Sequence, residues 1–318
     1  MPTAPNINAT VYARRHFTTA LNVQLTTDRQ DAQESLILYF YDGASDTVLG
    51  VSNCHVLCKN TNTTYEFEGD APKRWVRVNR IRQFQQDLDN IRADIDARRV
   101  RTDIQSKTIA KLEVIGTQTE QEQKKLRKIQ RALIDEQESI IELEALYNEV
   151  KNSWEDIGNR NIGHLRYVKA SSVDSQGGTL YTEDWKFKGV FEGNYVDLDP
   201  TVSLAVLIAK MNAQGDPSSA FEYPDDRKHW IKSVVSKEDQ ARPVLDHNDK
   251  SSYIVGKDGT TTGRTFGHYS GLESFICDES GIESVELGVY NWDPQSGVFS
   301  DKGDSGALIW DSLGRIFG

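Results

Sequence analysis

The sequence predicts a mainly β fold that is interrupted by a long antiparallel helical hairpin. Residues 35–58, SLILYFYDGASDTVLGVSNCHVLC, place a polar turn between two apolar runs, which is the pattern of a β-hairpin. The glycine- and threonine-rich peptide IVGKDGTTTGRTFGHYSG at 254–271 gives a second strand and turn signal. Between them, residues 78–155 contain no proline, one glycine and a dense mixture of charged and recurring apolar residues. This segment is therefore predicted to be helical.

The helical segment carries two apolar stripes that need a packing partner. Their members follow a heptad-like spacing and are Ile81, Phe84, Leu88, Ile91 and Ile95 in the first arm and Leu126, Ile129, Leu133, Ile140, Leu143, Tyr147, Val150 and Trp154 in the second. The turn GTQT at 116–119, with Thr119 as N-cap of the second arm, lets the arms pack as an antiparallel coiled coil. Each arm of about 37 residues would reach about 55 Å.

Two interpretations of this hairpin stay open. Its mixed charges fit a self-packed strut with a solvated surface. Its length favours a docking arm that engages a protein partner or a second copy of the chain. In either case the hairpin divides the chain into three predicted regions. Residues 1–77 begin the β domain, residues 78–157 form the inserted coiled coil, and residues 158–318 complete the domain, with one short helical patch expected at 201–213.

The composition excludes several classes of partner. With a net charge of −11, the chain has no basic field to attract nucleic acid or an anionic membrane, so neither is expected as a partner. The N-terminus lacks the apolar core of a secretory signal, and the longest apolar runs, LILYFY and LAVLIA, are too short to cross a bilayer. The three cysteines are too few for a disulfide scaffold. The chain is therefore expected to be cytoplasmic or otherwise intracellular.

The peptide DKGDSGALIW at 301–310 contains the main signal for catalytic chemistry. Acyl transfer by serine needs a hydroxyl nucleophile, an imidazole base, a carboxylate that orients the imidazole, and backbone N–H groups that face the oxyanion. Ser305 supplies the hydroxyl, and the neighbouring glycines let the backbone aim the N–H groups of Gly303 and Ser305 at one point. A plain turn between two strands is the alternative for these residue types. The candidate base is His55, which follows an apolar strand in VLGVSNCHVL, where a single histidine is otherwise structural.

The peptides SNCHV and GDSG, early and late in the chain, resemble those of the chymotrypsin-like serine peptidases, whose triad runs in the order His, Asp, Ser. SNCHV is closest to the TNxHV form of intracellular and bacterial trypsin-like proteases. The resemblance implies a chymotrypsin-like double β-barrel and endopeptidase activity on protein or peptide substrates, with His55 as general base and Ser305 as nucleophile. It implies Asp184 in TEDWKF as the orienting acid, because that peptide is similar to the DWA or DIA motif of the family. Asp197 and Asp199 in VDLDP are the reserve candidates, and no metal or cofactor is needed.

Further peptides bear on what the resemblance implies. VGKDGTTTGRTFG at 255–267 looks like the hairpin that precedes the nucleophile loop in the second barrel of the family. The position six residues before the serine lines the family's primary specificity pocket. Here it is Phe299, which implies an apolar or filled pocket, unless the loop shifts and brings Asp301 or Lys302 into it. In secreted relatives the equivalent of Asp304 pairs with a newly cut N-terminus. No activation peptide is recognisable here, so activation by cleavage is not expected.

Two departures from the family pattern concern the cysteines and the end of the chain. Secreted relatives place a disulfide-bonded cysteine directly after the histidine, whereas here Cys54 precedes His55 and Cys58 follows it by three positions. Both are expected to be reduced and at least partly buried; the alternative is a redox-sensitive thiol beside the general base. The sequence ALIWDSLGRIFG supplies only the start of the return strand that such a barrel needs, which suggests a truncated or degenerate member. A second function therefore stays open, in which an inactive peptidase fold acts as a scaffold through the coiled-coil hairpin.

Overall fold

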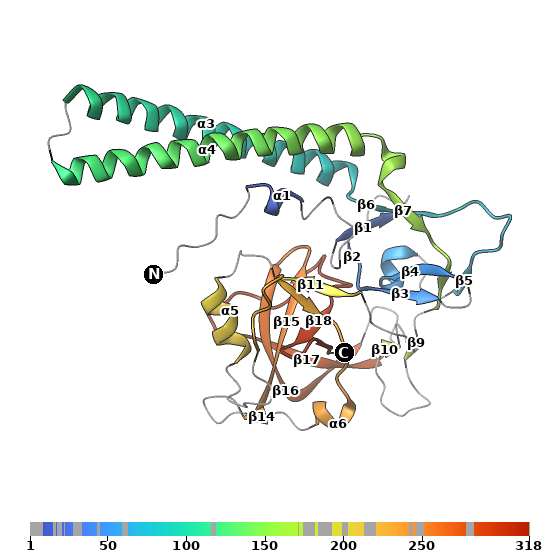
Figure 1. Cartoon of the computed structure of the whole chain (residues 1–318). Coiled ribbons are helices and arrows are strands. Elements are labelled where there is room, and N and C mark those ends of the chain that lie inside the picture. The colour runs from blue at the N-terminus through green and yellow to red at the C-terminus, as the bar shows by residue number, and fades with distance from the viewer. Residues whose placement is uncertain are drawn as a thin grey trace. The chain divides into compact units, whose positions relative to one another are not determined.

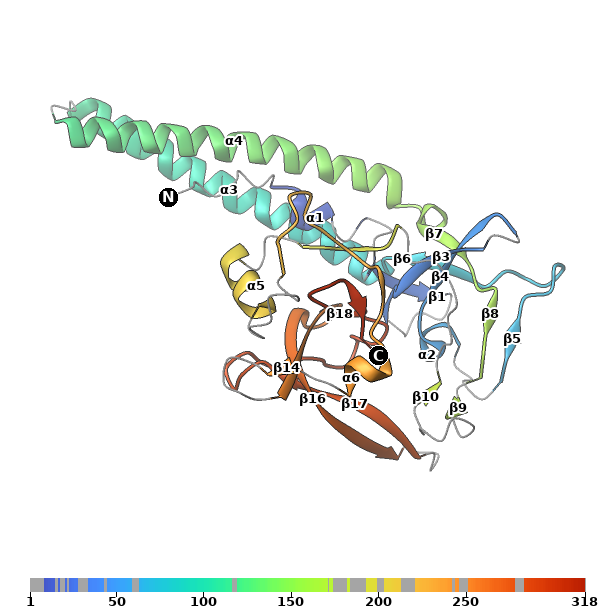
Figure 2. The same ribbon diagram turned by 60° about the horizontal axis from the view of Figure 1, so that its bottom comes forward.

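The structure of the chain is a computed structural model that divides into two compact units. The helical unit comprises Met1–Thr18 and Val78–Asn161, and the β unit comprises Thr19–Arg77 and Ile162–Gly318. Figures 1 and 2 show the elements of both units from two directions. The structure describes residues 9–14, 17, 21, 23–27, 34–42, 45–58, 63–115, 119–170, 172–173, 182–183, 193–198, 203–212, 221–241, 244–245, 251–277 and 283–317.

The helical unit is a long antiparallel pair of helices (Figure 1). Helix α3 spans Ile81–Ile115 and helix α4 spans Glu120–Trp154. Thr119 is the N-cap of α4: its hydroxyl accepts a hydrogen bond from the Glu122 N–H, and the Glu122 carboxylate accepts one from the Thr119 N–H. This reciprocal capping box stabilises the start of α4 and confirms the predicted N-cap. The two helices themselves confirm the predicted helical hairpin. Two shorter elements of the described part of the unit are α1, Val11–Arg14, and the 3-10 turn η2, Ile157–Arg160.

The apolar core of the helical unit lies where the start of α3 packs on the end of α4. Its buried side chains are Phe84, Leu88, Ile91, Ile95, Leu143, Leu146 and Val150. The predicted first stripe is therefore confirmed at four positions, but Ile81 is wrong, because its side chain is 50% exposed at the first turn. The predicted second stripe missed Leu146, which is 1% exposed. The helical period of 3.6 residues places it on the same face as Leu143 and Val150.

Ion pairs join the two helices beyond this core. Within the described residues 96–114 and 119–142 no residue is buried. The Arg98 and Arg101 guanidinium groups each lie 2.9 Å from Glu136, and Arg99 lies 2.6 Å from Glu144. Partly exposed pairs of this kind contribute about 0.2–1 kcal/mol each. This part of the pair is therefore held more weakly than the core, and it leaves apolar side chains such as Ile104 exposed.

The β unit consists of several sheets, almost all of them antiparallel. A seven-stranded sheet has the order β13-β19-β18-β15-β16-β17, with β14 also paired to β15. A four-stranded sheet has the order β2-β1-β6-β7, and the pairs β3–β4, β5–β8, β9–β10 and β11–β12 stand separately. The bounds are β1 Gln24–Thr27, β2 Glu34–Ser35, β3 Leu38–Asp42, β4 Thr47–Val51, β5 Tyr65–Glu66, β6 Trp75–Val78, β7 Asn161–His164, β8 Tyr167–Val168, β9 Ser172–Val173, β10 Thr182–Glu183, β11 Tyr195–Asp197, β12 Lys228–Trp230, β13 Ser233–Val234, β14 Val244–Leu245, β15 Ser251–Gly259, β16 Gly263–Cys277, β17 Glu283–Asn291, β18 Ile309–Asp311 and β19 Arg315–Ile316.

Both predicted β-hairpins are present in the β unit. Strands β3 and β4 pair from Leu38↔Val51 to Asp42↔Thr47, and β15 and β16 pair from Tyr253↔Tyr269 to Gly259↔Gly263. The strand before His55 ends earlier than predicted, because Cys54–Leu57 forms a short helical turn, α2. The predicted helical patch is also confirmed as α5, Leu204–Met211, and a further short helix, α6, spans Lys237–Gln240.

The main core of the β unit lies beside the seven-stranded sheet. Trp310 of β18 is fully buried, with Ile254, Phe266 and Leu308 in the same cluster. After β18 the chain turns at Gly314, which has a φ of 74°, and β19 pairs both with β18 and, in parallel, with β13. Among the described strands no sheet closes on itself into a barrel. The structure therefore has a long antiparallel helix pair and several antiparallel sheets, and the double β-barrel stays a prediction.

Candidate functional site

The loop that carries Ser305 consists of two consecutive turns that share Asp304. The Asp304 N–H donates to the Asp301 carbonyl at 3.0 Å, and the Ala307 N–H donates to the Asp304 carbonyl at 2.9 Å. The third position of each turn is a glycine with positive φ: 101° at Gly303 and 77° at Gly306. Positive φ at this position defines a type II turn and favours glycine. The sequence GDSG therefore folds into a sharp double bend with Ser305 near its apex.

The Asp304 carboxylate is the anchor of this loop. Oδ2 accepts hydrogen bonds from the Lys257 ammonium at 2.8 Å, the Thr262 hydroxyl at 2.7 Å and the Asp301 N–H at 3.0 Å. Oδ1 accepts from the N–H groups of Thr261 and Thr262 at 2.8 and 3.1 Å. The side chains of Lys257 and Asp304 are 2% and 0% exposed. Four of the five donors come from the end of β15 and the turn after it, so the β15–β16 hairpin fixes the Ser305 loop.

The charge on Asp304 is stabilised by these donors. Burial alone would raise the pKa of the carboxyl group, but the hydrogen bonds from Lys257, Thr262, Asp301 and Thr261 outweigh burial and hold the pKa well below its usual range. The carboxylate is therefore ionised at neutral pH. The Asp304 carboxylate lies so close to the backbone of β15 that position 259 has to be glycine, since a Cβ added there would lie 2.2 Å from Asp304 Oδ1.

Ser35 connects the Ser305 loop to the segment that leads to His55. The Ser35 N–H donates to the Ser305 carbonyl at 3.1 Å. The Ser35 carbonyl accepts a hydrogen bond from the Ser52 hydroxyl at 3.0 Å, and Ser52 lies three residues before His55. The Ser35 hydroxyl lies 3.0 Å from the Thr260 hydroxyl, in the β15–β16 turn. The fully buried Ser35 thus forms hydrogen bonds with two segments, those of His55 and Ser305, that are 250 positions apart in the sequence.

The structure describes the predicted triad residues to different extents. His55 is the second residue of α2, and the description covers its backbone but not its side chain. Asp184 and the reserve candidate Asp199 lie outside the described residues. The second reserve, Asp197, is exposed at the end of β11, where its carbonyl accepts a hydrogen bond from Arg264. The structure therefore links Ser52, three residues before His55, to the Ser305 loop through Ser35, while the positions of the imidazole and of the acid stay predictions.

The predicted oxyanion donors have no competing acceptor. Within the described part of the chain, the N–H groups of Gly303 and Ser305 donate no hydrogen bond, and the Ser305 hydroxyl has no partner. Both residues are partly exposed. Unpaired N–H groups in a tight turn next to a serine can donate hydrogen bonds to the negative oxygen of a tetrahedral intermediate.

The predicted pocket residues differ in burial. Phe299 is 6% exposed and packs in a cluster with Tyr253, Tyr269 and Phe317. Lys302 is exposed, and its carbonyl accepts a hydrogen bond from the Thr261 hydroxyl at 2.9 Å. Their roles in substrate selection stay predictions.

Sequence reasoning missed the partner of Asp304. Lys257 lies in the peptide VGKDGTTTG, which is predicted to form a hairpin, but a lysine side chain in a strand is ordinarily solvated. One sequence feature could have predicted the buried lysine. Around Lys257, the hairpin turn VGKDGTTTG is rich in glycine and hydroxyl residues and contains no other basic residue. The predicted burial of two cysteines is confirmed: Cys54 and Cys58 are 5% and 6% exposed in a cluster with Leu165 and Val168, and their redox state stays a prediction.

Comparison with models of known protein families gives no match, and comparison with curated proteins gives no significant match. Within the residues that the structure places, no group of three His, Cys, Asp or Glu side chains is arranged to hold a metal ion. Every helix in the same part of the chain is too short or too polar to cross a membrane.

Proposed function

We propose that the chain is a serine peptidase of chymotrypsin-like fold, in which Ser305 is the nucleophile, His55 the general base and Asp184 the orienting acid. The single observation that carries the proposal is the contact made by Ser35. It hydrogen-bonds the Ser305 carbonyl on one side and, through Ser52, the segment that leads to His55 on the other. In the double-barrel fold proposed here, β15, β16 and β18 belong to the second barrel, and β1–β4 with β6 and β7 belong to the first.

The reaction follows from the roles of these groups. Ser305 Oγ attacks the carbonyl carbon of the scissile peptide bond while the His55 imidazole takes the hydroxyl proton. The negative oxygen that forms accepts hydrogen bonds from the N–H groups of Gly303 and Ser305. His55 then gives the proton to the leaving amine, the C–N bond breaks, and water hydrolyses the acyl ester on Ser305 with His55 again acting as base. The hydrogen-bonded Asp304 keeps the two N–H groups in place, so that little reorganisation is needed.

A fluorophosphonate probe tests this proposal, because it forms a covalent adduct only with an activated serine. We expect one adduct on Ser305, located by peptide mass spectrometry, with loss of labelling in Ser305→Ala and in His55→Ala. Ser296→Ala, which removes an exposed hydroxyl in the turn before Phe299, is the matched control and should label like the parent chain. Unlabelled but folded protein would contradict the proposal.

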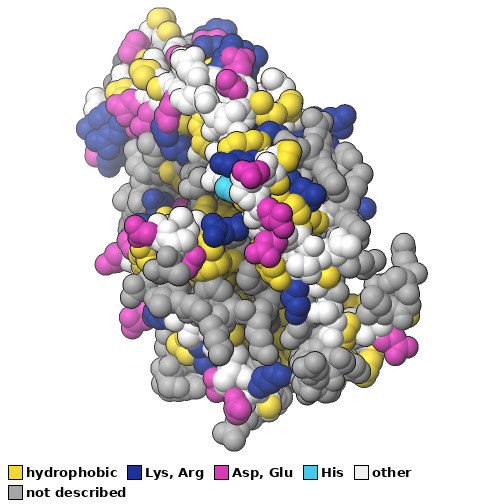
Figure 3. Space-filling model, turned by 90° about the vertical axis from the view of Figure 1, so that its right-hand side faces the viewer, with side chains coloured by type: hydrophobic (Ala, Val, Ile, Leu, Met, Phe, Trp, Pro, Cys, Tyr) yellow, Lys and Arg dark blue, Asp and Glu magenta, His cyan; other side chains and the backbone are white. Residues whose placement is uncertain are grey.

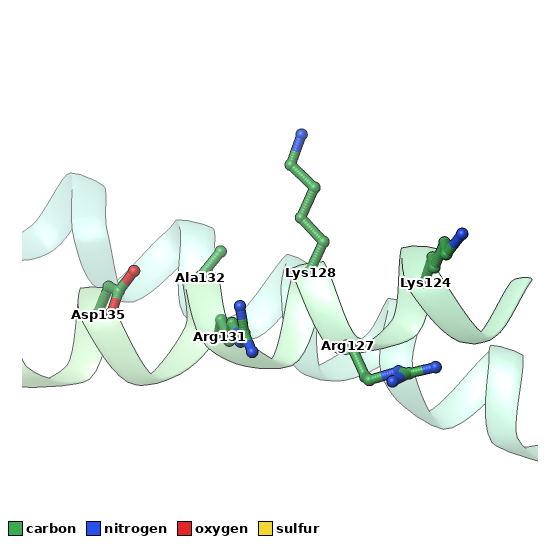
Figure 4. A pocket seen from close by; sticks show the side chains of 6 residues that line it. All are labelled: Lys124, Arg127, Lys128, Arg131, Ala132 and Asp135. Atoms are coloured by element: carbon green, nitrogen blue, oxygen red, sulfur yellow. The ribbon is translucent and has the colours of Figure 1, made fainter. Parts of the chain in front are cut away.

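A second candidate function is a scaffold that acts through the helical pair. The observation that favours it is a row of basic side chains on α4 that lines a surface hollow of about 440 Å³ (Figure 4). The lining residues are Lys124, Arg127, Lys128, Arg131, Ala132 and Asp135. Their spacing of three and four positions puts them on one face of the helix. Such a face suits an acidic segment of a protein partner or of a second copy.

The two functions predict different effects of charge reversal on α4. The double substitution Lys128→Glu and Arg131→Glu should abolish assembly or partner capture if the scaffold interpretation is right. It should leave fluorophosphonate labelling of Ser305 unchanged if the peptidase acts independently of the helical pair. Lys107→Glu with Lys111→Glu, on the exposed surface of α3, makes the same change in net charge and is the control. Sedimentation velocity measures the first outcome and probe labelling measures the second.

A further inference from the structure

A cavity of about 780 Å³ lies in the β unit, apart from the Ser305 hydroxyl. Its walls come from the β3–β4 hairpin, α2, β7 and β8, with single residues from β1 and β6. Most of the lining side chains are apolar. The most buried of them are Leu25, Leu36, Val51, Cys54, Leu165 and Val168, each less than 9% exposed. A cavity of this size and lining is typical of a small-molecule site, for which the usual range is about 300–1,000 Å³.

One rim of the cavity is basic. His164, Arg166 and Lys169 line it in sequence along β7, β8 and the residues between and after them. Figure 3 shows one face of the molecule, on which hydrophobic, basic and acidic side chains lie beside a histidine. Burial lowers the pKa of His164, and the nearby charges of Lys73 and Arg166 lower it further. The cationic side chains in this part of the lining are Arg166 and Lys169, whereas the net charge of the whole chain is −11.

The Arg166 side chain is the cation best placed to meet a ligand. It is exposed, and no carboxylate of a described residue pairs with it. An apolar cavity with a cation at its mouth is chemically complementary to a molecule that has an apolar body and one anionic head.

We propose that this cavity binds an amphipathic organic carboxylate, with its apolar chain between the β3–β4 hairpin and β8 and its carboxylate at Arg166. The apolar chain would displace water from walls that contain Leu36, Val51 and Val168, which is favourable in proportion to the area buried. The carboxylate would form charge-assisted hydrogen bonds with the guanidinium group. The proposal does not depend on proteolytic activity, because it uses none of the predicted catalytic side chains.

The position of the cavity has one consequence for the predicted site. Leu36 follows Ser35, the residue that bonds the Ser305 carbonyl, and Cys54 precedes His55. A bound ligand would therefore contact residues that are directly next to Ser35 and His55 in the sequence.

Gly163 offers a way to obstruct the cavity. It lines the cavity from β7, its φ is not positive, and an added Cβ would meet no heavy atom within 4 Å. Gly163→Phe therefore adds a large side chain without backbone strain at that position. Arg166→Ala removes the exposed cation at the rim without disturbing a buried group.

Isothermal titration calorimetry with sodium decanoate, below its micelle concentration, tests the proposal on the full chain. We expect saturable binding at one site, a loss of detectable binding in Gly163→Phe, and at least about tenfold weaker binding in Arg166→Ala. 1-Decanol, which has the same chain and no charge, should bind the parent chain and Arg166→Ala equally. Lys232→Ala removes an exposed cation of the β unit outside the cavity and should bind decanoate like the parent chain.

Three results would overturn the proposal: no saturable heat with decanoate, undiminished binding in folded Gly163→Phe, or equal binding of decanoate to the parent chain and Arg166→Ala. Circular dichroism establishes whether each variant is folded, and Arg166→Ala keeps the test decisive if Gly163→Phe does not fold. Because the readout is binding heat, its failure leaves the peptidase proposal untouched, and absence of probe labelling on Ser305 leaves this one untouched.

Discussion

Replacing Asp304 by alanine tests whether a buried carboxylate holds the Ser305 loop. The carboxylate accepts five hydrogen bonds, and its side chain is fully buried. The substitution leaves the Lys257 ammonium, 2% exposed, without its counter-charge. Removing one partner of a buried ion pair costs about 3–5 kcal/mol, because the remaining charge stays desolvated. We therefore expect the free energy of unfolding of the β unit to fall by about 3–5 kcal/mol.

Urea unfolding followed by tryptophan fluorescence measures this change. Lys302→Ala is the matched control, since it removes an exposed side chain of the same loop that has no hydrogen bond or ion pair with a described residue, and it should change the free energy of unfolding by no more than about 0.5 kcal/mol. The double variant Lys257→Met with Asp304→Ala removes both charges and should recover part of the loss, because the two side chains are in contact. The reasoning is refuted if Asp304→Ala costs less than about 1 kcal/mol or if the double variant is no more stable than the single one.

The pH dependence of the same quantity has a defined sign. Because the pKa of Asp304 is lowered in the folded state, its stabilisation is fully present above the ordinary carboxyl pKa of 3.8 and is lost as the pH falls through the folded value. The parent chain should therefore lose this contribution only below about pH 4. Asp304→Ala should show a shallower fall over that range.

Three further predictions concern other positions. Gly306→Ala should lower the free energy of unfolding by about 1–3 kcal/mol, and with it the unfolding temperature, because the φ of Gly306 is 77° and an added Cβ would lie 2.5 Å from the Ser35 carbonyl oxygen. Gly69→Ala, where an added Cβ would meet no heavy atom within 4 Å, should leave both quantities unchanged. Burial lowers the pKa of His229 in the folded state, so the unfolded state binds more protons below about pH 6.5. The free energy of unfolding should therefore decrease from pH 7 to pH 5 in the parent chain, and less steeply in His229→Phe. Thr119→Ala removes the capping box of α4 and should cost about 1 kcal/mol, seen as faster hydrogen exchange in the first turn of that helix, whereas faster exchange throughout α4 would contradict a local role.

Local patterns were the part of the fold that could be predicted from the sequence. The spacing of Phe84, Leu88, Ile91 and Ile95 predicted one helical arm, and the polar turn between two apolar runs predicted the β3–β4 hairpin. These features depend on residues within a few positions of each other, where the helical and strand periods act directly. The prediction failed at Ile81, the first residue of α3, which is 50% exposed and lies three residues before Phe84, the first buried member of the stripe.

Long-range contacts could not be predicted in the same way. The Lys257–Asp304 pair joins residues 47 positions apart, and the Ser35–Ser305 hydrogen bond spans a still longer separation. Nothing in the local sequence distinguishes a lysine that will be buried beside a carboxylate from one that will be solvated. The glycines of GDSG were an exception, since positive φ at Gly303 and Gly306 is required by the turns themselves. The basic-rimmed cavity likewise depends on elements that meet only after folding.

The pH dependence of the Ser305 acylation rate tests the central claim most directly, because it reports the group that accepts the hydroxyl proton. With a fluorophosphonate probe, the rate should rise with pH through one transition in the range where an ordinary imidazole titrates, near pH 6.5. His55→Ala should remove that transition and slow labelling by at least about 10³-fold. The same transition and rate in His55→Ala, or an adduct at another residue, would contradict the account.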